Sequence, residues 1–300
     1  MQHARDAGAG TWEGSLDLGR SRTQVLLSAD RWRWQGRDFP YPGRLKDRTV
    51  YWWDGGGFVP AARYGRALYK LVPTGWGVPT FEIDGIKMLP TSKSSPLEDA
   101  RAKVALVEPR GRRVLDTCGG LGYFAACALD AGAAHVHSFE KSVEVLWLRT
   151  LNPWSPDPGA PQVAARFTLE HDDVAQAIAR LPDAAYGAIL HDPPRFGIAG
   201  ELYSQGFYGQ LARVLAHALA EALHLGAGQE APEACVIGGE QIFRLALPRA
   251  RRIIATEIHA HVDGDTWFPP LPPGLWREAA RTTQPEENGL TFDFVTYERN

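Results

Sequence analysis

The clearest chemical pattern in the sequence is a glycine-rich turn between two acids. Asp116 ends the apolar run RRVLD, and Gly120 and Gly122 follow four and six positions later. Glycines let a backbone turn sharply and approach a ligand, and the helix expected next offers free N–H groups at its first turn. Glu140 ends the following strand, 20 residues after Gly120. An acid at that position accepts hydrogen bonds from ribose hydroxyls, so the pattern favours a nucleoside-containing ligand over a simple tight turn.

A second motif, ILHDPPRFG at 189–197, ends another apolar strand in an acid. In α/β proteins, ligands bind at the carboxyl ends of parallel strands. The motif joins an acid, two prolines that fix φ, a guanidinium that could hold an anion and a ring that could stack on a planar substrate. The candidates for the substrate side of the site are therefore Asp192, Pro193, Pro194, Arg195 and Phe196. The alternative is a rigid loop with no role in binding.

Alternating strands and helices are expected to position these side chains. The sequence predicts strands at 112–117, 135–140, 164–170 and 185–192, and helices at 94–107, 119–133 and 173–181. Either Ser94 or Ser95 could cap the first helix. Such alternation is typical of a parallel sheet with right-handed crossovers. Short aromatic runs broken by glycine and proline in residues 11–90 predict a small β-rich subdomain before it.

Composition narrows the class of protein. The 300 residues are 44% hydrophobic and 22% charged, as in an ordinary globular protein, and no apolar run is long enough for a membrane span. With no signal peptide visible, we expect a cytoplasmic protein that acts on a small molecule. The net charge of −3 does not indicate nucleic-acid binding, although a basic patch is possible; it would comprise Arg31, Arg33, Arg37, Arg44, Lys46 and Arg48. Oligomeric state is not indicated. Cys118, Cys127 and Cys235 have the spacing of neither a zinc site nor a disulfide framework.

Six stretches resemble a known family: YKLVPTG (69–75), PTFEIDGIKM (79–88), PLEDARAKV (96–104), DTCGGLGY (116–123), LNPWSP (151–156) and HDPPRFGIAGELYSQGFY (191–208). Together they resemble the predicted archaeal-type class I methyltransferases, which share spermidine-synthase-like features, over residues 15–212. The resemblance implies S-adenosylmethionine as cofactor, with its binding residues at Asp116, Gly120, Gly122, Tyr123, Glu140 and Asp172. Asp172 would contact the adenine amino group, with Asp173 as the alternative. Cys118 departs from the pattern, because many methyltransferases have glycine there.

The tail resembles a different enzyme. Residues 234–269 and 292–299 are similar to the C-terminal half of dihydrofolate reductase, and 216–234 to the helix and loop before it. That resemblance implies that Ile237, Gly238 and Gly239 lie against NADPH and substrate, and that Thr256 supports the carboxylate that assists folate protonation. The reductase's first half, which should carry that carboxylate, is not recognisable in residues 1–212.

The sequence therefore predicts an α/β protein in three segments. These are a β-rich subdomain (1–93), a Rossmann-like methyltransferase sheet (94–212) and a dihydrofolate-reductase-like α/β segment (213–300). We expect the tail to add its strands at 235–239, 253–260 and 292–299, with a helix at 241–248, to the methyltransferase sheet. The junction near 211–218 is either a natural fusion or an artefact that joins two fragments.

Methyl transfer to an unidentified acceptor is the favoured function. One candidate acceptor is an amine, which Asp192 could orient or deprotonate. The alternatives are aminopropyl transfer, dihydrofolate reduction with NADPH, and a non-catalytic mosaic of two half-domains. No metal site is expected.

Overall fold

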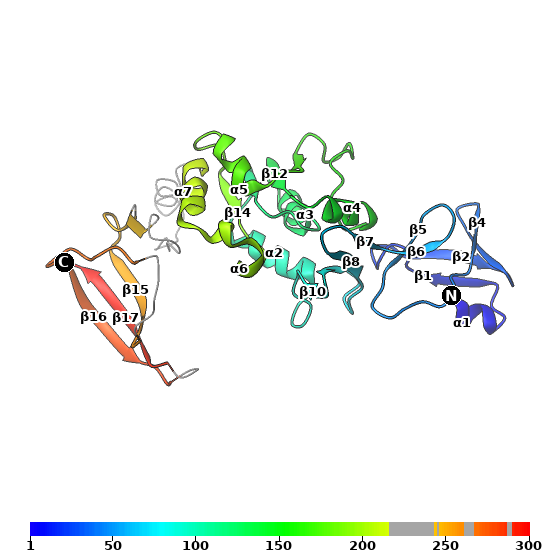
Figure 1. Cartoon of the computed structure of the whole chain (residues 1–300), viewed down its shortest axis with the longest axis horizontal. Helices are drawn as coiled ribbons and strands as arrows, with labels where there is room; N and C mark the ends of the chain where they lie inside the picture. Colours follow the sequence, from blue (N-terminus) through cyan, green and yellow to red (C-terminus); the bar gives the residue numbers. More distant parts are fainter. Residues whose placement is uncertain (216–242, 245, 261–266, 287–289) are drawn as a thin grey trace. The chain divides into compact units, whose positions relative to one another are not determined.

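The computed structural model describes residues 1–215, 243–244, 246–260, 267–286 and 290–300 (Figure 1). The chain forms two compact units, and each is considered by itself. The larger comprises Met1–Ala199 with Val214–Ala216, and the smaller comprises Gly200–Arg213 with His217–Asn300. The predicted strand at 235–239, with Ile237, Gly238 and Gly239, lies outside the described residues, as does most of the predicted helix at 241–248. The division into three segments at 93 and 212 stays a prediction.

The core of the larger unit is a four-stranded parallel sheet in the order β13-β12-β11-β14. Its strands are β11 (Arg113–Asp116), β12 (His135–Phe139), β13 (Phe167–Glu170) and β14 (Ala188–Leu190). The first strand thus lies between the second and the fourth, and the direction of winding reverses between β11 and β14. This order is that of a Rossmann-like sheet, and the side chains of Val114 and Val136 at its centre are fully buried. The predicted parallel sheet is confirmed.

Helix α2 (Pro96–Leu106) precedes the sheet, and further helices connect its strands. These are α3 (Tyr123–Asp130), α4 (Val143–Leu151), α5 (Val174–Ala177) and the 3-10 turn η1 (Ile178–Arg180). Ser95, not Ser94, caps α2: its hydroxyl accepts from the Glu98 N–H, and the Glu98 carboxylate accepts from the Ser95 N–H. This reciprocal capping box, together with Pro96 at the first turn, explains why the helix begins there.

Antiparallel strands make up the beginning of the chain, as predicted. The sheet β1-β2-β3-β4 spans Thr11–Gly14, Thr23–Leu27, Arg31–Trp34 and Arg37–Pro40; β5 (Tyr51–Trp53) pairs with β6 (Phe58–Pro60). A further sheet contains β7 (Ala62–Tyr64), β8 (Leu68–Val72), β9 (Thr80–Ile83) and β10 (Ile86–Lys87). Leu71 and Phe81 of this last sheet share one hydrophobic core with Val114 and Leu121. The short helix α1 (Gln2–Asp6) was not predicted.

The basic patch suggested by the sequence is partly neutralised. Arg31 and Arg33 both pair with Asp38, and Arg48 pairs with Glu82. These pairs reduce the positive potential that a nucleic-acid backbone would meet.

After β14 the chain passes through α6 (Phe196–Ala199), the 3-10 turn η2 (Gly200–Tyr203) and α7 (Gln205–Val214). Beyond α7, Leu215 forms an isolated parallel bridge with Tyr186, and the Tyr186 N–H donates to the Val214 carbonyl at 3.1 Å. Just before the described chain is interrupted, it therefore runs beside the start of β14.

The prediction that the tail extends the methyltransferase sheet is wrong for the strands that the structure describes. Instead, β15 (Arg252–Ile258), β16 (Trp276–Thr283) and β17 (Phe292–Arg299) form their own antiparallel sheet in the order β15-β17-β16 (Figure 1, orange to red). β17 hydrogen-bonds on both edges to strands of the tail, so it is the centre of this sheet. β16 was missed because its sequence WREAARTT is largely polar and lacks a clear apolar alternation.

Candidate functional site

The glycine loop lies between β11 and α3 and is pinned to the ends of neighbouring strands. Gly120 and Gly122 have φ values of +47° and +83°, a conformation that favours glycine. The Gly119 N–H donates to the Phe139 carbonyl at 2.7 Å, which ties the loop to the end of β12. A Cβ on Gly119 would lie 2.4 Å from the Ser138 hydroxyl. Close packing therefore explains the glycine at position 119, and the positive φ values explain the glycines at positions 120 and 122.

Glu140 holds the loop through hydrogen bonds to the backbone. One carboxylate oxygen accepts from the Gly120 N–H at 2.9 Å, and the other accepts from the Ser142 N–H at 2.8 Å. Each oxygen has a second lone pair, so the carboxylate can still accept hydrogen bonds from a diol. Burial raises the pKa of Glu140, while the two N–H groups and Arg149 oppose that rise. Glu140 therefore shapes the loop, and its contact with ribose hydroxyls stays a prediction.

Asp116 is fully buried at the end of β11, directly before the loop. Its carboxylate accepts from the Ser138 hydroxyl at 2.8 Å, and its other oxygen has no hydrogen-bond partner among the described residues. Burial raises the pKa of Asp116 to about 6, although Ser138 and Arg149 act in the opposite direction. Direct contact between Asp116 and a ligand would need the loop to open, so its contacts fit a role in shaping the loop.

Tyr123 and the acids after β13 have local roles that the sequence did not anticipate. Tyr123 is buried and donates to the Pro79 carbonyl at 2.7 Å, so its hydroxyl is engaged in the core. Asp172 pairs with Arg180 and accepts from its neighbour's N–H at 2.8 Å. Asp173 caps α5 by accepting from the Ala175 N–H at 3.0 Å. Asp172 is thus the acid of the two that is not used as the helix cap.

Asp192 lies at the end of β14 and is paired with a lysine from α2. The Lys103 ammonium donates to the Asp192 carboxylate at 2.8 Å and contacts Asp99 at 3.0 Å. It also lies 5.5 Å from the centre of the Phe124 ring. The ion pairs with Asp192 and Asp99 raise the pKa of Lys103, against the effect of its burial. Sequence reasoning missed Lys103 because nothing in α2 marks the side chain that reaches β14.

The carboxyl ends of β11 and β14 are tied together. The Thr117 N–H donates to the Leu190 carbonyl at 3.1 Å, and the Thr117 hydroxyl contacts His191 Nδ1 at 2.8 Å. Cys118 comes directly after Thr117. Burial raises the pKa of its thiol to about 12, and the charges of Asp116, Glu140 and Asp192 act in the same direction. The loop, Glu140 and Asp192 therefore share one edge of the sheet, where the thiol stays protonated.

The other residues predicted for the substrate side of the site come directly after Asp192 in the sequence. Pro193 and Pro194 are partly exposed and Arg195 is exposed; α6 begins at Phe196, whose side chain lies outside the described part of the structure.

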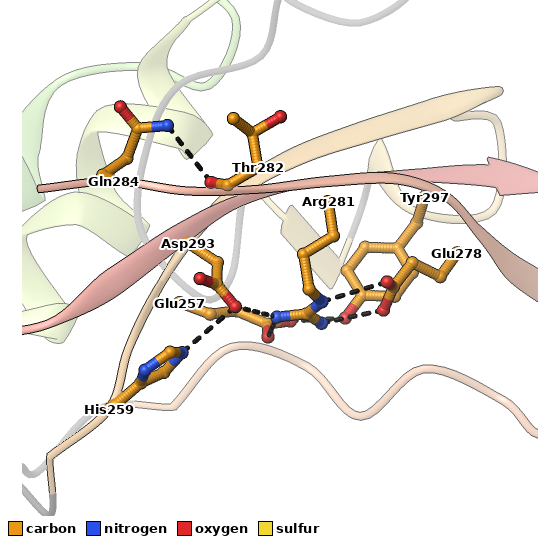
Figure 2. Close-up of polar contacts among 8 residues, drawn as sticks. All are labelled: Glu257, His259, Glu278, Arg281, Thr282, Gln284, Asp293 and Tyr297. Carbon is orange, nitrogen blue, oxygen red and sulfur yellow. Dashed lines mark hydrogen bonds and ion pairs between the residues drawn. The ribbon is translucent and has the colours of Figure 1, made fainter.

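In the smaller unit, Thr256 is exposed on β15 and pairs in register with Phe294. The opposite face carries a charged network that the sequence did not suggest (Figure 2). Its centre is Arg281, whose guanidinium contacts three carboxylates, those of Asp293 at 2.6 Å, Glu278 at 2.7 Å and Glu257 at 2.9 Å. His259 contacts Asp293 at 3.1 Å, and the Tyr297 hydroxyl donates to Glu257. The network joins all three strands.

Among the residues that the structure describes, no group of three or more histidine, cysteine or acidic side chains could hold a metal ion. No helix in the described part of the chain is long and apolar enough to cross a membrane.

Comparison with known proteins separates the two parts of the chain. The family model for dihydrofolate reductase matches residues 205–299, which confirms the resemblance of the tail. The type 3 dihydrofolate reductase of Salmonella typhimurium is 44% identical over 69 residues, 22% of this chain and 43% of that protein. An uncharacterised protein of Methanocaldococcus jannaschii is 40% identical over 167 residues, 55% of this chain and 56% of that protein. The chain thus spans about half the length of these curated relatives.

Solved structures similar to the chain include methyltransferases and spermidine synthases. A spermidine synthase in complex with a transition-state analogue is 12% identical, with a TM-score of 0.45, and the match covers 96% of this chain and 80% of that one. A putative RNA methyltransferase from Pyrococcus horikoshii is 14% identical, with a TM-score of 0.33, over 70% of this chain and 88% of that one. Because these sequence identities and TM-scores are low, the assignment of a Rossmann-like fold rests on the strand order of the parallel sheet.

Proposed function

We propose that the larger unit is an S-adenosylmethionine-dependent methyltransferase that acts on a small-molecule acceptor. The observation that carries the proposal is the link between Glu140 and the Gly120 N–H beside the carboxyl end of β11. A bound cofactor would supply an electrophilic methyl group on its sulfonium. Glu140 would bind the ribose hydroxyls, and the loop backbone would contact the amino-acid part.

Asp192 supports the assignment of the acceptor side. It lies at the end of β14, on the same edge of the sheet as Glu140 and next to two prolines. Methyl transfer needs in-line positioning of the nucleophile more than covalent help from the protein. An ionised Asp192, held by Lys103, would orient an amine acceptor and accept its proton. Arg195 and Phe196 complete the proposed acceptor side.

Isothermal titration with the thioether product, S-adenosylhomocysteine, tests the proposal. We expect wild-type protein to bind it, and Glu140→Gln to bind it about 5- to 100-fold more weakly, since each hydrogen bond to a charged group contributes about 1–3 kcal/mol. Glu13→Gln, an exposed acid on β1, is the matched control and should bind normally. Unchanged affinity in a folded Glu140→Gln protein, or absence of binding in wild type, would contradict the proposal.

Aminopropyl transfer is the alternative within the same fold, and the resemblance of residues 15–212 to a family with spermidine-synthase-like features motivates it. Its donor is decarboxylated S-adenosylmethionine, which lacks the carboxylate of the methyl donor. Tighter binding of the decarboxylated compound than of S-adenosylmethionine would favour aminopropyl transfer over methylation.

The family match of the tail motivates dihydrofolate reduction as a second candidate. Hydride transfer to a folate needs a placed proton source as well as NADPH. The matched relatives are about twice as long as the matching segment, and no carboxylate from a reductase-like first half is recognisable. We infer that the chain has no appreciable reductase activity. NADPH oxidation that requires dihydrofolate and is blocked by methotrexate, in protein free of host reductase, would refute this; Thr256→Val should change nothing.

A further inference from the structure

The segment LRTLNPWSP, residues 148–156, packs behind the glycine loop and has no part in the function proposed above. Arg149 on α4 is 5% exposed, and its Nη1 donates to the Gly120 carbonyl at 3.3 Å. The Ser155 hydroxyl donates to the Leu121 carbonyl at 2.7 Å, and the Asn152 amide donates to the Tyr123 hydroxyl at 3.1 Å. The segment therefore holds the loop through hydrogen bonds to three of its consecutive or near-consecutive residues, Gly120, Leu121 and Tyr123.

The loop glycines leave room for the Arg149 guanidinium. A Cβ on Gly122 would lie 2.5 Å from Arg149 Nη2, and one on Gly119 would lie 3.1 Å from Nη1. The Nε and Nη2 atoms of Arg149 are buried without a hydrogen-bond partner among the described residues. A buried guanidinium with incomplete hydrogen bonding is expensive unless its charge is compensated. The compensation must therefore come from nearby acids.

Two acids supply that compensation, one from each neighbouring strand. Arg149 interacts electrostatically with Asp116 at the end of β11 and with Glu140 after β12. From β13, the Phe167 ring lies 5.8 Å from the guanidinium carbon and brings no charge. The other charged or titratable groups that face the two acids are Lys141, beside Glu140, and the protonated thiol of Cys118. One buried cation thus interacts with two acids, Asp116, which is buried, and Glu140, which is half-buried.

We infer that Arg149 is a positioning residue that keeps Asp116 and Glu140 ionised beneath the glycine loop, and so sets the pH range over which the loop binds its cofactor. The inference rests on the proposed function. A protonated Glu140 carboxyl would lose one acceptor oxygen, and it must accept from two N–H groups and a ribose diol. Arg149 and Glu140 both hydrogen-bond to Gly120, and an opposite charge nearby favours the ionised form of an acid. Without Arg149, both acids should take up protons at higher pH.

The test combines titration of S-adenosylhomocysteine from pH 5.5 to 9 with ¹³C NMR titration of the unliganded protein's labelled carboxyl groups. In Arg149→Met, the pKa of both carboxyls should rise by about one unit or more, as expected for loss of a neighbouring opposite charge. The pH at which affinity is lost should rise with them, with affinity near pH 9 least affected. Arg149→Lys should restore most of the wild-type profile. Arg149→Met combined with Glu140→Gln should bind weakly at all pH values, with much less pH dependence.

Arg166 provides the matched control, because it also holds backbone carbonyls, those of Leu129 at 2.7 Å and Ala133 at 3.0 Å. Arg166→Met should lower the melting temperature without moving the pH profile. If Arg149→Met is unfolded, Arg149→Gln replaces it. Unchanged carboxyl pKa values or an unchanged binding profile would overturn the inference. Wild-type protein that binds no S-adenosylhomocysteine would overturn the proposed function instead, and the carboxyl titration would still decide whether Arg149 keeps the acids ionised.

Discussion

Replacing Asp116 by asparagine should stabilise the larger unit at pH 8. Burial raises the pKa of Asp116 from 3.8 to about 6 even with Arg149 nearby, so at pH 8 the carboxyl is ionised but at a higher free-energy cost in the folded state than in the unfolded chain. At about 1.4 kcal/mol per pKa unit, keeping this acid ionised costs about 3 kcal/mol. Asparagine has the same shape and no charge, and its carbonyl can accept from the Ser138 hydroxyl as the acid does. Arg149 keeps Glu140 as a counter-ion, so the guanidinium is not left uncompensated.

The sign of the pH dependence follows from the same shift. Between about pH 4 and pH 6 the folded state binds more protons than the unfolded state, so the wild-type free energy of unfolding falls as the pH rises through that window. Asp116→Asn should lack this contribution. Its advantage over wild type should therefore be about 3 kcal/mol at pH 8 and close to zero near pH 4.

Urea unfolding at pH 8 and at pH 4, followed by tryptophan fluorescence, measures both values; eight of the ten tryptophans lie in the larger unit. Asp47→Asn is the matched control, because Asp47 is exposed and the substitution removes the same charge. It should change the free energy of unfolding by less than about 0.5 kcal/mol. An Asp116→Asn protein that is less stable than wild type at pH 8, or that shows the same difference at both pH values, would refute the reasoning.

Three further predictions follow from the same geometry. Gly122→Ala should lower stability by at least about 2 kcal/mol in thermal unfolding, since strain at positive φ adds to a clash, whereas Gly85→Ala, also at positive φ but in open space, should lose only about 1 kcal/mol. Asp192→Asn should lower turnover with the acceptor while the affinity for S-adenosylhomocysteine changes less than about twofold; a collapse of affinity would reverse the assignment. Arg281→Met should destabilise the smaller sheet more than Arg277→Met, which breaks a single exposed pair, as hydrogen exchange of β17 amides would show.

The sheet of the larger unit was predictable because its signals are local. Each strand is a short apolar run that ends in an acid or at the glycine loop, and helices separate the runs. Gly120 and Gly122 mark a turn by their type alone, and Ser95 with Glu98 marks a helix start. Such patterns depend on a few neighbouring residues, so a single sequence carries them.

The side chains that complete the site were not predictable, because their partners are distant in the sequence. Lys103 meets Asp192 across 89 positions, and Arg149 meets Gly120 across 29. Nothing in either helix distinguishes these residues from other basic side chains on a solvated face. The predicted partners of the tail strands were wrong for a related reason. Apolar alternation indicates that a strand has a buried face, but it does not indicate which strand pairs with it.

Charged side chains have different roles in the two units. In the smaller unit, Arg281 pairs with three carboxylates on three strands, and that network holds the sheet together (Figure 2). The face that carries Thr256 exposes Ile254 by 76% and Phe294 by 48%, and among the described residues there is no acid beside Thr256 on that face to protonate a folate. In the larger unit, Glu140 and Asp192 lie at the ends of strands near the glycine loop. Their carboxylate oxygens keep lone pairs that can accept further hydrogen bonds. Ligand binding needs acceptors with free lone pairs next to accessible backbone, and this supports the proposal that the chemistry of this chain lies at the carboxyl edge of the parallel sheet.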